Sequence, residues 1–254
     1  MRHCEIISQQ VFRNLLTLEY LSSIDLAEDV ISTGGSSMAE AVLTISSRNY
    51  SSWSLRGWLL CRLAGLTIEE KVQSIDDPST RAELLLLSPS VLVPRLSHDG
   101  AEVWDTLAIA EYLAEIRPEA PLLPPDRIAR AHCRAVSGEM HSGFHNLRSA
   151  LPMNLKAHYP GFKIWAGARP DIERVCTIWR ECLSTYGGPY LFGRLSIADA
   201  MFAPVATRFL TYDVPLDKRC AGYRDTILQW PAMVEWTEAA KAEPEEIDEL
   251  DVEF

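Results

Sequence analysis

Residues 91–104, which read VLVPRLSHDGAEVW, contain two short apolar segments separated by a turn signal at residues 98–100. The Asp-Gly pair in that signal predicts a tight turn, so this stretch should form two neighbouring strands. Pro94 lies inside the first strand, where it has no N–H to donate to a neighbouring strand. A proline at that place needs a structural reason, and this requirement sets the stretch apart from an ordinary hairpin.

The segments on both sides of this hairpin alternate between the hydrophobic periods of strands and helices. Strands are predicted at residues 41–45 and 67–75, and helices at residues 54–64, 78–87 and 106–116. Gly65 ends the first helix, and Pro78 occupies the first position of the second. The order strand, helix, strand, helix, strand, strand, helix indicates an α/β domain.

The chain changes character at residues 118–126, which include four prolines. The remainder has no convincing strand, and its periodicity predicts helices at residues 127–151, 170–186, 196–210 and 230–242. We therefore expect an α/β plus all-α protein, with an α/β domain at residues 41–117, a linker at 118–126 and an all-helical domain at 127–254.

The two ends of the chain differ from these domains in composition. Residues 1–37 end in a run of serine and glycine just before Met38, and we expect them to be a flexible N-terminal extension. Residues 243–249 are strongly acidic and are expected to form a solvated tail.

The overall composition excludes several classes of protein. The 254 residues carry 24 Lys and Arg against 35 Asp and Glu, a formal charge of −11. Nucleic acid and anionic membranes are therefore poor partners for the average surface, although a local basic pocket can still bind one small anion. No run approaches the ~20 apolar residues of a membrane-spanning helix. The six cysteines include no CxxC pair, which favours reduced thiols in the cytoplasm.

Four short motifs lie at the boundaries of the predicted elements. They are SSRNYSSWSLR at residues 46–56, Val93-Pro94 in the hairpin, Trp104-Asp105-Thr106 before a helix, and LFGRLSIAD at residues 191–199. Their order and context resemble those of glutathione S-transferases, over roughly residues 41 to 242. The resemblance implies a thioredoxin-like domain that binds glutathione, followed by a helical bundle domain with a cleft for a second substrate. It also implies a bacterial-type, soluble, serine-activated member that acts as a cytoplasmic homodimer in detoxification.

In the first motif, the resemblance implies a serine hydroxyl that activates glutathione. A free thiol has a pKa near ~8.5 and the thiolate is the nucleophile, so an activating site must favour the anion. A hydroxyl donor at the positive end of a helix does this. Ser51, five residues before Arg56, is our first choice, and its neighbours Ser52 and Tyr50 are alternatives. Otherwise the serine is an ordinary helix N-cap.

The second and third motifs would bind glutathione itself. A cis bond before Pro94 would turn the backbone of Val93 outward to pair with the cysteinyl amide, as if glutathione were an added strand. Asp105 and Thr106 resemble the pair that holds the γ-glutamyl end, Thr106 through its hydroxyl and N–H and Asp105 through its charge. The alternatives are a trans proline at a sheet edge and ordinary helix caps.

The fourth motif and the helical domain supply further candidates. Ser196 and Asp199, three residues apart, predict a capping box with a structural role. Tyr50, Met140, Phe144 and Arg148 are candidates for the second-substrate cleft, Arg148 for an anionic substrate, although apolar side chains at helical spacing are more often core.

His141 and His145, spaced four apart on one predicted helix, have a spacing that can bind a metal. No HExxH signature accompanies them, so we expect no metal. Partly exposed helix histidines are the simpler interpretation, and contact with substrate is the next.

The sequence thus predicts a glutathione S-transferase that presents glutathione, its co-substrate, as a thiolate to a small electrophile. An isomerase resembling maleylacetoacetate isomerase is the alternative, because Ser51-Ser52 partly resembles the Ser-Ser-Cys stretch of that family. A cysteine-type reductase is weaker, since no cysteine occupies the turn. A glutathione-binding or interaction protein without catalysis on the same scaffold also remains open.

Overall fold

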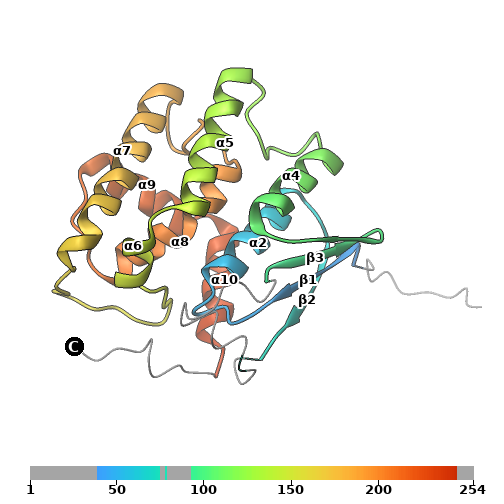
Figure 1. Cartoon of the computed structure of the whole chain (residues 1–254), viewed down its shortest axis with the longest axis horizontal. Helices are drawn as coiled ribbons and strands as arrows, with labels where there is room; N and C mark the ends of the chain where they lie inside the picture. Colours follow the sequence, from blue (N-terminus) through green and yellow to red (C-terminus); the bar gives the residue numbers. More distant parts are fainter. Residues whose placement is uncertain (1–38, 75–77, 79–92, 245–254) are drawn as a thin grey trace, which may run out of the picture. The chain divides into compact units, whose positions relative to one another are not determined.

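The computed structural model describes residues 39–74, 78 and 93–244. Its strands are β1 (Ala41–Ile45), β2 (Ile68–Val72), β3 (Arg95–His98) and β4 (Ala101–Val103), which form one sheet in the order β2-β1-β3-β4 (Figure 1). The pairing of β1 with β2 is parallel and the other two pairings are antiparallel. The fold is that of a thioredoxin-like domain followed by a helical domain.

The hairpin between β3 and β4 has the predicted turn. Asp99 and Gly100 have φ angles of 46° and 76°, the left-handed region that a two-residue hairpin turn of this kind requires. The turn sets the register, with Leu96 opposite Val103 on one side and opposite Leu43 of β1 on the other. Leu43 and Leu96 are completely buried, so the turn chemistry and the apolar pattern agree.

Helix α2 (Ser52–Leu63) connects β1 to β2 and contacts both the sheet and helix α4 (Thr106–Ile116). Its Leu55 and Leu59 are completely buried, as the periodicity predicted, and Gly65 ends it with a φ of 69°. The predicted helix from Pro78 lies outside the described residues apart from Pro78 itself. The predicted extension at residues 1–37 and the tail beyond residue 244 lie outside them as well.

The second half of the described chain is helical, as expected. Its helices are α5 (Arg127–Ser142), α6 (His145–Ala150), α7 (Arg169–Tyr186), α8 (Ile197–Thr211), α9 (Lys218–Leu228) and α10 (Pro231–Lys241), with a 3₁₀ turn, η1 (Ala166–Ala168). Helix α9 was not predicted from the sequence. Asp217 caps this helix by accepting from the N–H groups of Arg219 and Cys220, so an acidic N-cap was the signal that could have found it.

The single helix predicted at residues 127–151 is wrong, because the chain breaks between α5 and α6. Phe144 has a φ of 60°, which no helix interior allows, and a Cβ at Gly143 would lie 2.7 Å from the carbonyl oxygen of Glu139. His145 therefore starts a new helix. His141 and His145 do not share one helix face, which removes the spacing that suggested a metal site.

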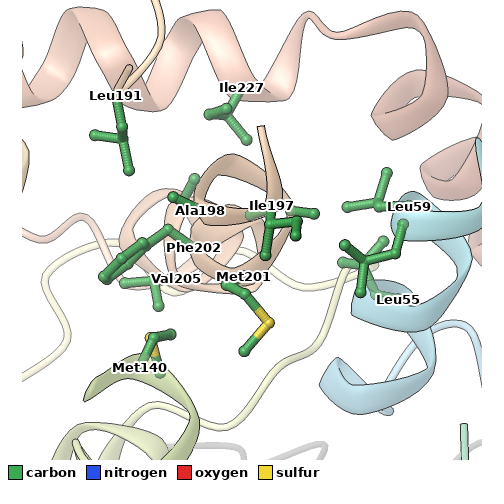
Figure 2. Close-up of a cluster of buried hydrophobic side chains, with 14 of the residues drawn as sticks. Leu55, Leu59, Met140, Leu191, Ile197, Ala198, Met201, Phe202, Val205 and Ile227 are labelled. Atoms are coloured by element: carbon green, nitrogen blue, oxygen red, sulfur yellow. The ribbon is translucent and has the colours of Figure 1, made fainter. Parts of the chain in front are cut away.

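Helix α8 is the centre of the helical domain. It contacts α2, α5 and α9, and Figure 2 shows its apolar side chains between those of the neighbouring helices. Met201 and Phe202 of α8 lie close to Met140 of α5 in this view, and all three are completely buried. The core is therefore continuous from helix α2 into the helical domain.

The start of α8 is held by a buried carboxylate. Asp199 Oδ2 accepts from both the backbone N–H and the hydroxyl of Ser196, each at 2.9 Å. Its Oδ1 accepts from the N–H of Leu191 at 3.1 Å and from the hydroxyl of Tyr223 in α9 at 3.0 Å. Four donors thus converge on one side chain that has no exposed surface.

The pKa of Asp199 provides a test of this arrangement. Burial raises its pKa to about 6, against the opposing effect of the hydrogen bonds from Leu191, Ser196 and Tyr223. Since the folded state then holds a proton that the unfolded chain releases near pH 4, the stability from this group falls as pH rises from about 4 to about 6. We predict that the excess stability of the wild type over Asp199→Asn is smaller at pH 7.5 than at pH 4.5, by about 2 kcal/mol, in urea unfolding. An excess that is equal at both values, or larger at pH 7.5, would contradict this.

A close contact between α2 and the proline of the hairpin provides a second test. A Cβ placed on Gly57 of α2 would lie 2.5 Å from Cβ of Pro94, so only glycine lets the helix approach this ring. Gly57→Ala should therefore destabilise the protein by about 1–3 kcal/mol through overpacking, despite the better helix propensity of alanine. The matched control is Gly138→Ala inside α5, where a Cβ meets nothing within 4 Å and a gain of about 0.5–1 kcal/mol is expected. Thermal unfolding of both variants checks the opposite signs, and a stabilised Gly57→Ala would refute the contact.

Candidate functional site

The turn between β1 and α2 places the hydroxyl of Ser51 at the N-terminus of α2. Ser51 is the N-cap, and its Oγ accepts from the N–H of Ser54 at 3.3 Å. The alternative role of helix cap is therefore present, but capping uses a lone pair of the oxygen and leaves the hydroxyl proton available. Ser52, the first residue of α2, is likewise buried, with 6% of its surface exposed.

The loop before Ser51 is held by the C-terminal end of the described chain. The carboxylate of Glu243 accepts from the hydroxyl of Ser47 at 2.9 Å, from the N–H of Arg48 at 2.8 Å and from the N–H of Asn49 at 3.2 Å. Only 10% of this side chain is exposed. The expectation of a solvated tail starting at Glu243 is therefore wrong for this residue, because backbone donors of a distant loop bind its charge.

Two further contacts hold the same loop against the helical domain. The indole N–H of Trp236 in α10 donates to the carbonyl oxygen of Arg48 at 3.0 Å. The buried Asn49 accepts at Oδ1 from the N–H groups of Leu155 and Lys156, at 2.7 and 3.1 Å. The loop that precedes Ser51 thus has its polar groups bound by residues from the other half of the fold, which fixes its conformation.

The second motif has the backbone form that the resemblance implied. The peptide bond between Val93 and Pro94 is cis, and both residues are buried just before β3. The ring of Pro94 packs on Gly57 of α2, five residues after Ser52. The hairpin proline and the N-terminal half of α2 therefore lie together.

The third motif shows two roles for Asp105. Its Oδ1 caps α4 by accepting from the N–H groups of Leu107 and Ala108, at 2.9 and 3.3 Å. Its Oδ2 lies 3.0 Å from Nε2 of His141 in α5, so this carboxylate also links the two halves of the fold. Thr106 is 1% exposed, and its hydroxyl has no hydrogen-bond partner among the residues described. A buried hydroxyl of that kind is available to a ligand.

Trp53, in the first turn of α2, connects this region to two arginines. Its ring meets the His141 ring edge-on at 5.2 Å between centroids. The guanidinium carbons of Arg56 and Arg148 each lie 4.5 Å from the centroid of the same indole. Cation–π contacts of this length stabilise charged guanidinium groups against the indole ring. Arg148, which the sequence suggested for the second-substrate cleft, therefore contacts Trp53, the residue that follows Ser52 in the chain.

The other candidates for a second-substrate cleft lie in the interior. Met140 is completely buried, and Phe144 and Tyr50 are 7% and 5% exposed. For Met140 and Phe144 this supports the simpler interpretation as core. Trp53 and Glu243 were not predicted from the sequence as site residues. Glu243 could not be found because its partners are some 195 residues away in sequence.

Within residues 39–74, 78 and 93–244, no group of three or more His, Cys, Asp or Glu side chains is placed to hold a metal ion. The helices in these ranges also include none that is both long and apolar enough to cross a membrane.

The hydrogen bonds from the loop to Glu243 can be tested by substitution. Glu243→Gln replaces a charged acceptor with an amide whose N–H₂ group faces donors, so buried N–H groups lose their partner. We expect a loss of about 2 kcal/mol in the free energy of unfolding, measured in urea. Glu238→Gln is the matched control, because this glutamate of α10 is 66% exposed and pairs only with Lys241 among the described residues. The idea fails if both substitutions change stability by the same small amount.

Family models match the chain in two places: "Glutathione S-transferase, N-terminal domain" at residues 50–116 and "Glutathione S-transferase, C-terminal domain" at residues 142–239. Both matches fall on the elements that carry the four motifs.

Curated relatives agree with these matches. A probable maleylacetoacetate isomerase of Caenorhabditis elegans is 32% identical over 169 residues, 64% of this chain and 77% of the relative. The maleylacetoacetate isomerase of Mus musculus is 35% identical over 173 residues, 66% and 78% of the two chains. Glutathione S-transferase 1 of Dianthus caryophyllus is 28% identical over 165 residues, 64% and 75%.

Solved structures agree in fold. A glutathione transferase homolog from Burkholderia, determined with bound glutathione, superposes with a TM-score of 0.59 at 22% identity, covering 80% of this chain and 99% of that one. Glutathione transferase Omega 3C of Trametes versicolor gives a TM-score of 0.58 at 17% identity, with coverages of 78% and 88%. With both domain models matched in order and relatives above 30% identity covered over most of their length, the chain belongs to the glutathione S-transferase family.

Proposed function

We propose that this protein is a glutathione-dependent enzyme that holds the thiol of glutathione as a thiolate with the hydroxyl of Ser51. The observation that carries the proposal is the buried Ser51 hydroxyl at the N-terminus of α2, whose oxygen accepts from Ser54 and whose proton remains available. Family membership supplies glutathione as the co-substrate.

The chemistry follows from the local electrostatics. A thiolate beside Ser51 would accept the hydroxyl proton in a hydrogen bond and face the N–H groups at the positive end of α2. Each effect contributes on the order of 1 kcal/mol, so together they would lower the thiol pKa by about one to two units. The sulfur then bonds to an electrophilic carbon of the second substrate, and the leaving group departs with its electron pair.

The backbone of Val93 and the side chains of Asp105 and Thr106 would bind the remaining parts of glutathione. The backbone of Val93 before the cis bond would pair with the cysteinyl amide. The hydroxyl of Thr106 at the start of α4, which has no partner among the described residues, would bind the γ-glutamyl carboxylate, and Asp105 would face the ammonium group. Ser52 is the alternative thiolate donor.

We also infer a glutathione-binding domain at residues 41–117, a linker at 118–126 and a helical domain at 127–254 that receives a small electrophile. On the same grounds we infer a cytoplasmic homodimer that acts in detoxification.

An isomerase is the second candidate, because the curated relatives include several maleylacetoacetate isomerases. The two activities differ in the fate of glutathione, since a transferase consumes one molecule per turnover and an isomerase returns it. Counting free thiols before and after turnover of a given substrate therefore separates them.

The test of thiolate formation is an ultraviolet titration of bound glutathione against pH. We expect a bound thiol pKa about one to two units below the free value in the wild type, and most of this shift lost in Ser51→Ala. Ser52→Ala is the matched control, since it removes the neighbouring hydroxyl of the same turn, and it should keep the shift.

Two results would count against the proposal. If the shift disappears in Ser52→Ala and persists in Ser51→Ala, the donor is Ser52. If wild-type protein binds glutathione with an unshifted pKa, the chain is a glutathione-binding protein without thiol activation.

A further inference from the structure

Three arginines that have no acidic partner among the described residues are buried close together near the candidate site. Arg56 of α2 is completely buried, Arg208 of α8 is 4% exposed and Arg148 of α6 is 9% exposed. The positive charges of Arg148 and Arg208 act on Arg56, and that of Arg148 acts on Arg208. In the described part of the chain, no carboxylate forms an ion pair with any of the three.

Their hydrogen-bonding capacity is only partly used. Arg56 donates from Nε to the carbonyl oxygen of Met201 at 2.8 Å and from Nη1 to that of Ser52 at 3.2 Å. Buried N–H groups without a partner among the described residues remain on all three: Nη2 of Arg56, Nε of Arg148, and Nε and Nη1 of Arg208. Native proteins seldom leave buried guanidinium groups in that state.

At each of the three positions the surroundings lower the pKa of the guanidinium group. Burial lowers the pKa of Arg148, and burial together with the charge of Arg148 lowers the pKa of Arg208 to about 9. Burial, Arg208 and Arg148 hold the pKa of Arg56 well below its usual value. Unpaired like charges in a low-dielectric interior destabilise a fold, and a bound anion removes this cost. The cluster also stands out in a chain whose formal charge is −11.

We propose that Arg56, Arg148 and Arg208 form a binding site for the carboxylate of the second substrate. The planar guanidinium fork matches a carboxylate through paired hydrogen bonds, which favours this group over a point anion such as chloride. Arg148 is the most exposed of the three and would contact the anion directly, while Arg56 and Arg208 supply positive potential behind it.

The position of the cluster gives it a role in the proposed reaction, on which this inference rests. Nη1 of Arg56 is bonded to the backbone of Ser52, the neighbour of the proposed thiolate donor, and Arg148 lies over Trp53 in the same turn. A carboxylate held there would bring the rest of its molecule next to the sulfur. The substrate class is therefore an electrophile that carries a carboxylate.

The first experiment measures binding without glutathione. Succinate is titrated into the full-length protein in a chloride-free buffer, with thermal shift and tryptophan fluorescence as readouts, and dimethyl succinate serves as the neutral probe. We expect saturable stabilisation by succinate and none by the diester. In Arg148→Gln the affinity for succinate should fall at least about tenfold, because the variant loses a charge-assisted hydrogen bond to the carboxylate.

The stability of the variant without ligand separates a binding role from a structural one. Removing an unpaired buried charge should leave the melting temperature of Arg148→Gln equal to or above that of the wild type. A structural arginine would lower it. Arg127→Gln is the matched control, because Arg127 is an exposed arginine at the start of α5, and it should bind succinate like the wild type.

Several outcomes would overturn the inference. These are equal stabilisation by the diester or by chloride, unchanged succinate affinity in Arg148→Gln, and a lowered melting temperature of that variant. If glutathione competes with succinate and loses affinity in Arg148→Gln, the cluster binds glutathione instead. The thiol titration described above is run on the same preparation, so a normal thiolate with no succinate binding refutes this site while thiol activation stands.

The second experiment uses turnover. The kcat/KM for 4-chloro-3,5-dinitrobenzoate is compared with that for its methyl ester; in both, the sulfur–carbon bond forms as chloride leaves. The ratio of acid to ester should exceed one in the wild type and in Arg127→Gln, and fall at least about tenfold in Arg148→Gln. A ratio that does not change in Arg148→Gln would contradict the proposed site.

Discussion

The buried carboxylate of Asp199 is the interaction on which the rest of the structure depends. By accepting from Ser196, Leu191 and Tyr223, it joins the start of α8, the segment before it and α9. Helix α8 then packs on α2, and the carbonyl oxygen of Met201 in α8 accepts from Arg56. Since α2 begins with the Ser51 cap, the geometry of the candidate site is set by a polar group in the other half of the fold.

Both halves of the fold therefore contribute residues to the candidate site. Glu243 and Trp236 hold the loop before Ser51, and His141 of α5 pairs with Asp105 at the start of α4. The arginine cluster has the same character, with one member on α2 and two on helices of the second half. A second substrate bound between these contributions would be positioned by side chains from both halves, as pre-organised reaction geometry requires.

Most of the fold could be predicted from the sequence because its signals are local. The Asp-Gly turn, the short apolar run of β1 and the period of α4 involve neighbours a few residues apart. The break at Phe144 and the bond from Arg56 to Met201, 145 residues away, depend on tertiary packing instead. The motifs indicated Ser51 and Asp105, whereas Glu243 and Arg208 become visible only when distant segments are placed together.

The attachment of the loop to Glu243 also has a consequence for biosynthesis. The N–H of Arg48 finds its acceptor 195 residues later in the chain, which at a translation rate of about 5–20 residues per second means a wait of about 10–40 s. Throughout that time the loop before Ser51 lacks the carboxylate that binds its N–H groups. A nascent chain therefore carries the turn at Ser51 without this partner until α10 and Glu243 have left the ribosome.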